Sequence, residues 1–310
     1  MAYTADDLLA EVRRSGSLPS AAATGTADAD ILAHADSELR DTLVPMLLNV
    51  REEYYQRVFD TTVTAGTATY RLNKRLAHSR VNTVQWLDAS SNIFNLARLE
   101  PRRVPELQTG TTSGNPWAYY LEGSRVVLFP TPSASGTLRI RGFVRPGRLA
   151  LVAASGSIAI TVVTGTTSYV LTITGHTYTT STPVDVIAAT PSFEHLAIDT
   201  TPTATASNTI TMLATGFTTA PAVGDYVVAP DTSPFIQLPV ELHPALIELT
   251  TARVLRALGK LTEAQAHSEE AKRMAAMGVE ALTPRTENSA RKITGGRAWR
   301  RQSIGTWGRW

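Results

Sequence analysis

The chain contains no cysteine among its 310 residues. Because disulfides, thiol nucleophiles and thiolate metal sites all need cysteine, these three kinds of chemistry are excluded. Charged residues are also scarce, at 18%, while the hydrophobic content is that of a globular protein. No apolar run reaches the roughly 18 to 20 residues that cross a bilayer. The start of the chain lacks the basic and apolar blocks of a secretory signal, so we expect a protein made in the cytoplasm, with no membrane partner.

The chain also lacks the short motifs that mark common catalytic sites. It has no glycine-rich phosphate loop, no dinucleotide-binding fingerprint, no zinc-hydrolase helix and no nucleophile elbow. Two of the six histidines, His176 and His195, share a segment with Asp185 and Asp199, but ordinary structural histidines explain this set better than a metal site does. We therefore predict that the protein is not an enzyme and holds no cofactor and no metal.

Lysine and arginine are absent from residues 153–230, which are crowded with threonine. Apolar residues alternate there, as at Ile158, Ile160 and Val162, and this period of two is typical of strands with one buried face. The pattern predicts an inserted small β-domain, a barrel or a sandwich, over residues 153–231. The alternative is a glycosylated, threonine-rich stalk, which has no core and hence no reason for apolar alternation.

Helical periodicity begins near the start of the chain. Thr4 and Asp7 have the spacing of an N-cap with an acidic first turn, and Gly16 suits the end of that helix. A longer apolar repeat predicts a helix over residues 28–59. Pro45 must kink or split this helix, because proline has no amide hydrogen and its ring crowds the preceding turn.

Helical periodicity returns near the other end of the chain. Apolar positions predict a helix from residue 239 to Gly259, where glycine ends it. Thr262 and Gln265 have the spacing of a capping box, which predicts a second helix running to about residue 277. We expect residues 1–60 and 238–282 to form one helical bundle.

Between the first helices and the insert, the period changes to two. Glu122-Gly123-Ser124 predicts a hairpin between two strands. These observations predict a β-rich unit over residues 61–152, and the chain as a whole is expected to be an α+β protein. Its strands are predicted at residues 68–72, 81–87, 93–99, 119–121, 125–129 and 137–144.

The extended C-terminal segment, residues 283–310, has a composition of its own, and we call it the tail. Residues 285–310 hold seven basic residues and one acidic residue, a net charge of +6, whereas the rest of the chain carries −4. Three of the five tryptophans also lie there, and tryptophan and arginine are enriched at binding hot spots. The predicted partner-binding residues are Arg291, Lys292, Arg297, Trp299, Arg300, Arg301, Trp307, Arg309 and Trp310.

Three interpretations of the tail remain open. It docks into a groove of a partner protein, it binds nucleic acid through phosphate contacts and base stacking, or it folds back on its own chain. The first is favoured, because the glycines let the tail follow a groove and the indole rings bury large apolar areas.

Three local patterns, in order along the chain, resemble a known family. They are AGTATYRL at residues 65–72, TSGNPWAYYLEGSRVVLFPTPSASGTLRIRGFVRP at residues 112–146, and QLPVELHPALIELTTARVLRALGK at residues 237–260. Together they resemble the head-to-tail adaptor, or connector, proteins of short-tailed bacteriophages. The inserted β-domain departs from the compact form of that family.

The resemblance implies a structural adaptor in the virion, at the portal vertex of the head-tail junction. Such proteins form a ring with copies of themselves, usually twelve, that seals the vertex and lets genomic DNA pass. The C-terminal segment would bind the portal protein, and the far end of the ring would carry the tail nozzle or other tail proteins. Two alternatives remain: a tail component that binds host-surface glycans through the inserted domain, and a DNA-binding packaging accessory.

Overall fold

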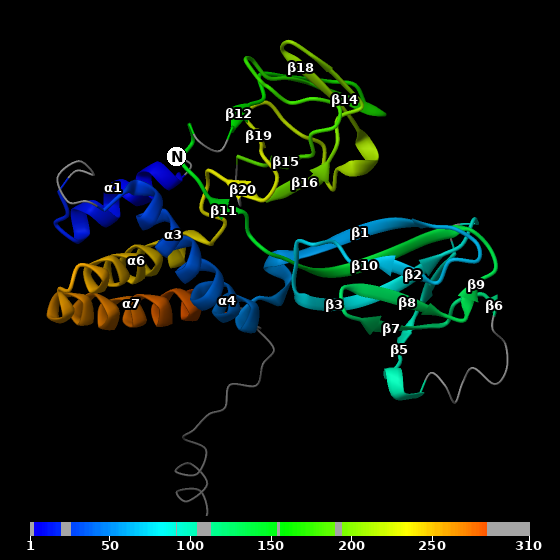
Figure 1. Ribbon diagram of the computed structural model, residues 1–310, viewed down its shortest axis with the longest axis horizontal. Coiled ribbons are helices and arrows are strands. Elements are labelled where there is room, and N and C mark those ends of the chain that lie inside the picture. Colours follow the sequence, from blue (N-terminus) through cyan, green and yellow to red (C-terminus); the bar gives the residue numbers. More distant parts are fainter. Residues whose placement is uncertain are drawn as a thin grey trace, which may run out of the picture.

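The computed structural model describes residues 3–19, 26–90, 92–103, 113–153, 156–189 and 194–283. Figure 1 shows a helical bundle at one end of the long axis, a β-unit at the other end, and an inserted β-domain above them. The mixture of helices and mostly antiparallel sheets confirms the α+β class. Within the described ranges, no helix is both long and apolar enough to cross a membrane.

The helical bundle combines segments from both ends of the described chain. Helix α6 packs against α1, α3 and α7, and α4 reaches α7. Their shared core includes Leu8, Ile31, Leu47, Leu246 and Leu255, all of them buried. The helices are α1 (Ala5–Ser15), α3 (Asp28–Glu38), α4 (Val44–Val50), α6 (His243–Ala257) and α7 (Leu261–Leu282), with a π-helix at Leu39–Leu43 and 3-10 turns at Glu52–Tyr55 and Val240–Leu242.

The first helix begins and ends where its sequence predicts. The Asp7 amide donates to Thr4 Oγ1 at 3.1 Å, and the Thr4 amide donates to Asp7 Oδ2 at 2.9 Å, which completes a capping box. Gly16 occupies the C-cap. Thr4 is therefore confirmed as the N-cap, and the two exchanged bonds satisfy amides that a helix start leaves unpaired.

The predicted long helix is divided and ends early. The π-helix Leu39–Leu43 precedes Pro45, which stands in the first turn of α4, so regular α-helical bonding is interrupted just before the proline, as expected. The prediction of helix up to residue 59 is wrong, because β1 (Gln56–Val63) replaces its last turns. β1 pairs along its whole length with β10 (Gly136–Val144), and this tertiary pairing overrides the helical spacing.

The predicted cap at Thr262 is also wrong. Helix α7 starts at Leu261 with Lys260 as its cap residue, so Thr262 lies inside the first turn. Gly259, at φ +78, supplies the left-handed turn that sets this start. The helix then continues past residue 277 to Leu282, and Gly278 allows close packing: a Cβ there would lie 2.7 Å from the Glu241 carbonyl oxygen.

Two four-stranded sheets pack together in the β-unit around buried Trp86, Leu128 and Ile140. The predicted hairpin is confirmed, since Glu122 lies opposite Arg125 and Gly123 takes a φ of +56. The first sheet has the order β1, β10, β3 (Leu76–Leu87), β4 (Ile93–Asn95), and the second β2 (Thr69–Arg71), β8 (Arg125–Phe129), β7 (Ala118–Glu122), β5 (Ala97–Arg98). Two short pairs, β6 (Ser113–Gly114) with β9 (Thr131–Pro132) and β11 (Arg148–Leu149) with β20 (Thr232–Ser233), and a 3-10 turn at Pro101–Arg103 complete the connections.

The inserted domain is a sandwich of two four-stranded sheets, and neither closes into a barrel within the described residues. Ile160, Leu171, Val186, Ile210 and Met212 are buried between them. One sheet has the order β12 (Ile158–Ala159), β19 (Tyr226–Val228), β15 (Val184–Ile187), β16 (His195–Thr200), and the other β13 (Val162–Thr164), β14 (Ser168–Thr172), β18 (Thr209–Leu213), β17 (Ala204–Ala206). A 3-10 turn, Ala214–Gly216, follows β18.

Candidate interaction site

The nine predicted partner-binding residues of the tail, from Arg291 to Trp310, lie outside the described residues. What the structure describes is the surface from which the tail starts. Helix α7 ends at Leu282 on the side of the bundle where it packs against α4 and the 3-10 turn Val240–Leu242. The tail therefore begins beside these two elements.

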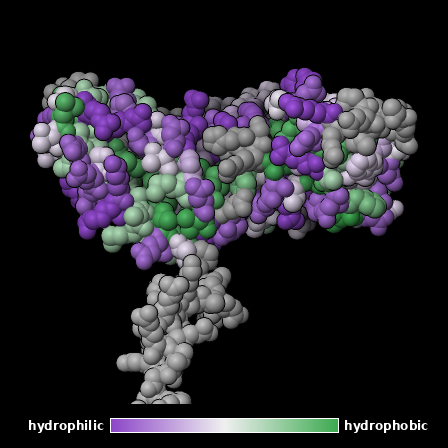
Figure 2. Space-filling model, turned by 90° about the horizontal axis from the view of Figure 1, so that it is seen from below, coloured by the Kyte–Doolittle hydropathy of each residue, from purple (hydrophilic) through white to green (hydrophobic). Residues whose placement is uncertain are grey.

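The surface at this end of the bundle is apolar and acidic. Val240 and Met277 are 69% and 59% exposed, although both belong to helical segments. Figure 2 shows the corresponding hydrophobic surface at the end of the bundle. Tyr54 is half-buried, and burial together with the neighbouring Glu241 carboxylate raises the pKa of its hydroxyl to about 12. Exposed apolar side chains gathered beside acids form a surface that suits a basic, aromatic partner segment.

Charge is divided among the three structural units. The helical segments, residues 1–55 and 238–283, hold 16 acidic and 9 basic residues, whereas residues 56–152 hold 5 acidic and 13 basic ones. Residues 153–237 hold five acids and no base. The bundle and the inserted domain are thus acidic and the β-unit is basic, so its net charge favours contact with each of the other two.

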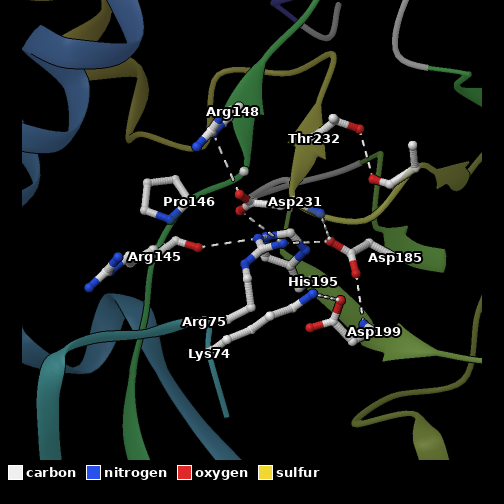
Figure 3. A network of polar contacts seen from close by, with 12 residues as sticks. Lys74, Arg75, Arg145, Pro146, Arg148, Asp185, His195, Asp199, Asp231 and Thr232 are labelled. Atoms are coloured by element: carbon white, nitrogen blue, oxygen red, sulfur yellow. Dashed lines mark hydrogen bonds and ion pairs between the residues drawn. The ribbon is translucent and has the colours of Figure 1, made fainter. Parts of the chain in front are cut away.

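A buried ion pair lies where the inserted domain meets the β-unit. Arg75 precedes β3 and is 2% exposed, and its Nη1 donates to Oδ2 of Asp185 in β15, which is fully buried, at 2.7 Å. Arg75 Nη1 also lies 3.3 Å from Asp231 Oδ1, and Nη2 donates to the Arg145 carbonyl oxygen at 3.3 Å. Figure 3 shows these groups converging on the Arg75 guanidinium. One arginine therefore joins the insert to the β-unit and to both connecting segments.

Asp185 is held from the other side by backbone amides. Its Oδ1 accepts from the Asp199 amide at 2.8 Å, and its Oδ2 accepts from the Asp231 amide at 3.1 Å. Burial nevertheless raises the pKa of Asp185 above its ordinary value, against the opposing effect of Arg75. The carboxylate depends on its cation, since an uncompensated charge at this depth carries a large desolvation cost.

Further ion pairs surround the buried one. Lys74 Nζ lies 3.0 Å from Asp199 Oδ1, and Arg57 Nη1 lies 2.7 Å from Glu194 Oε1. In each pair the acid belongs to the insert and the base to the β-unit. The absence of lysine and arginine from the insert thus has a structural use, because its acids are matched by cations of the unit on which it docks.

His195 belongs to this junction. Its Nε2 lies 3.1 Å from Arg75 Nη2 and 3.0 Å from Gln237 Nε2, both of which are donors, so Nε2 accepts and the ring is neutral. Burial and the nearby Arg75 and Arg57 lower the pKa of His195 well below its usual range. His176 lies elsewhere, where it stacks on Tyr178. Within the described residues, no group of three or more histidines and acids could hold a metal ion.

The sequence prediction missed the role of this junction. Asp185, Asp199 and His195 stood out only as a weak metal set, and Arg75 did not stand out at all. Arg75 is 110 residues from Asp185, so no local spacing connects them. The available signal was indirect: a segment with acids but no bases needs cations from another part of the chain.

Taken together, the described residues form three packed units, and buried and half-buried ion pairs hold the insert against the β-unit. The chain belongs to the SU10 adaptor protein family, whose model matches residues 3–163, just over half of its length. It is therefore a phage adaptor, a class of virion structural protein that contacts other phage structural proteins. The match covers the first helices, the β-unit and the start of the insert. None of the curated proteins matches the chain.

Proposed function

We propose that this phage adaptor forms a ring, of twelve copies, between the portal and the tail, where it seals the vertex and lets DNA pass. It acts without catalysis, cofactor or metal. The observation that carries the proposal is the start of the tail beside exposed Val240 and Met277 on the acidic bundle. We assign this end of the bundle, together with the tail that follows it in the sequence, to binding of the portal protein.

The tail supplies the anchor in this proposal. Its arginines and tryptophans, among them Arg297, Trp299, Arg300 and Trp307, dock on the portal, and twelve tails acting together make the joint slow to open. The β-unit and the insert then form the far end, which carries the tail nozzle or other tail proteins. The basic excess of the β-unit supports contact with the passing DNA.

The experiment removes residues 285–310 and measures binding of the remaining chain to purified portal rings. We expect binding to weaken by at least about a hundredfold, because hot-spot side chains each cost about 2 kcal/mol or more. A matched control replaces only the seven basic residues with glutamine and keeps the tryptophans, and it should lose part of the affinity and most of its salt dependence. Full binding by the truncated chain would exclude the tail as anchor.

The DNA-binding alternative makes a different prediction. If the protein were a packaging accessory, its affinity for duplex DNA would be nanomolar and would fall steeply with salt. We expect weak binding instead, since the chain outside residues 285–310 carries a net charge of −4. The protein without residues 285–310 separates the two activities. If the tail binds DNA, this protein loses its affinity for DNA and keeps its affinity for the portal.

A further inference from the structure

A groove of about 630 Å³ separates the β-unit from the inserted domain. β1 supplies one wall, and β16 with the turn at Ala214–Gly216 supplies the opposite wall. Arg71 of β2 and Arg139 of β10 lie at its side. Figure 1 shows β1 along the edge of its sheet that is nearer to the inserted domain. The groove is thus bounded by strands that stand at the edges of three different sheets.

β1 has an unused hydrogen-bonding edge. It pairs with β10 on one side over all eight of its residues, and it is the outermost strand of its sheet. On the other side, no described backbone or side-chain group bonds to the β1 main chain. Eight residues at about 3.3 Å each offer a straight edge of about 26 Å, with donors and acceptors alternating at strand spacing. An edge of this kind is a template for an added strand.

The charges beside the groove favour an anionic occupant. Arg57, Arg71 and Arg139 line it, against the single lining acid Asp60, and Arg57 is paired with Glu194 at 2.7 Å. Asp60 is already paired with Arg139, at 2.8 Å. Arg71 is exposed and has no ion-pair partner among the described residues, and Arg125 lies directly opposite it on β8. Like charges directly opposite on neighbouring strands repel, so a carboxylate bound here would reduce the repulsion between Arg71 and Arg125.

We propose that this groove binds an extended acidic segment of another protein, which adds to β1 as a further strand. Its main chain pairs with the free edge of β1, and its carboxylates reach Arg71 and the neighbouring arginines. Phe59 and Phe217 supply apolar contact for the alternate side chains. The chain's own tail does not fit, because its seven bases would be repelled. A nucleic acid would match the cations but not the row of backbone donors and acceptors.

The experiment uses the full-length protein and a capped, fluorescent peptide of about ten residues, with glutamate at every second position and threonine or valine between. A matched peptide carries lysine in place of glutamate. We expect the acidic peptide to bind and the basic one not to. Arg71→Glu should weaken binding by about tenfold or more, which is about 1.4 kcal/mol. Arg98→Glu, the same change on the opposite edge strand of the same sheet, should leave it within about twofold.

Hydrogen–deuterium exchange locates the peptide. Exchange of β1 amides should slow when the acidic peptide binds, while β4, at the other edge of the same sheet, should be unaffected. Attraction of the peptide to the basic tail would not depend on Arg71, so equal affinities for the Arg71→Glu and Arg98→Glu proteins would overturn the proposal. Unprotected β1 amides would overturn it as well. A single-stranded oligonucleotide that binds more tightly than the peptide, and loses affinity with Arg71→Glu, would assign the groove to nucleic acid instead. None of these outcomes depends on portal binding.

Discussion

Replacement of Arg75 by methionine removes the cation at the centre of the junction and keeps most of the side-chain volume. Asp185 then stays fully buried, with two backbone amides as donors but without its ion-pair partner. Removing one partner of a buried ion pair costs about 3 to 5 kcal/mol, because the other charge remains desolvated. The cost arises from the orphaned carboxylate rather than from the lost attraction.

Proton uptake sets an upper limit to this cost. An aspartate in the unfolded chain has the ordinary pKa of 3.8, about three units below pH 7, and each unit is worth about 1.4 kcal/mol. Neutralising the carboxyl group therefore costs at most about 4 kcal/mol at pH 7. We expect Arg75→Met to lower the free energy of unfolding by about 3 to 4 kcal/mol at that pH.

Protonation of Asp185 also determines how the stability of Arg75→Met depends on pH. Without Arg75, the folded protein holds a proton on Asp185 that the unfolded chain releases, so the folded state gains stability as the pH falls toward the ordinary Asp pKa. The deficit of Arg75→Met relative to the natural protein should shrink by up to about 1.4 kcal/mol per pH unit between pH 7 and pH 5. Urea unfolding followed by far-UV circular dichroism measures both quantities at each pH.

Two further variants make the test decisive. Arg139→Met breaks the half-exposed pair with Asp60 and should cost less than about 1 kcal/mol. The double variant Arg75→Met/Asp185→Asn removes the orphaned charge and should recover more than half of the loss. If Arg75→Met costs no more than Arg139→Met, or if its deficit is the same at pH 5 and pH 7, the reasoning from the buried carboxylate is refuted.

Three further predictions concern single positions. His195 has a lowered pKa in the folded state, so the unfolded chain binds the extra proton and stability falls as the pH drops below 6.5. His195→Gln should reduce the slope of unfolding free energy against pH by up to about 1.4 kcal/mol per pH unit, as measured by urea titrations. An unchanged slope would contradict a neutral, buried His195. Gly278→Ala should lower stability by about 1 to 3 kcal/mol, although alanine has the better helix propensity, because the added Cβ meets the Glu241 carbonyl. A variant that proves more stable in thermal unfolding would disprove the close packing. Thr4→Ala should lower the free energy of unfolding by about 1 kcal/mol through loss of the cap, whereas Thr262→Ala should lower it by less than about 0.5 kcal/mol. Equal losses would mean that Thr262 is a cap after all.

Local sequence patterns were sufficient where a feature depends on neighbouring residues. The Thr4 N-cap, the interruption before Pro45 and the Gly123 hairpin each follow from residues within one turn of each other. The apolar alternation of the insert likewise predicted a β-domain, because one face of each strand had to be buried.

Local patterns failed where distant segments compete for the same residues. Residues 56–59 continue a helical spacing, yet they pair with β10, which lies about 80 residues further along the chain. Thr262 and Gln265 have the spacing of a cap, but the helix starts at Leu261 after the turn at Gly259, two residues too early for it. In the first case a contact that no window of sequence contains decided the outcome, and in the second a left-handed turn close by in the sequence did.

By itself, the sequence determined the α+β class, the separation of an insert without bases and the basic, tryptophan-rich character of the tail, because composition and periodicity are local properties. The tertiary structure alone decided which charges meet. It placed Arg75 against Asp185 and His195, and it left the outer edge of β1 open beside Arg71. The physical reason is that a buried ion pair and a free strand edge both depend on how units distant in sequence pack together. The predicted partner-binding residues of the tail, by contrast, rest on the sequence alone.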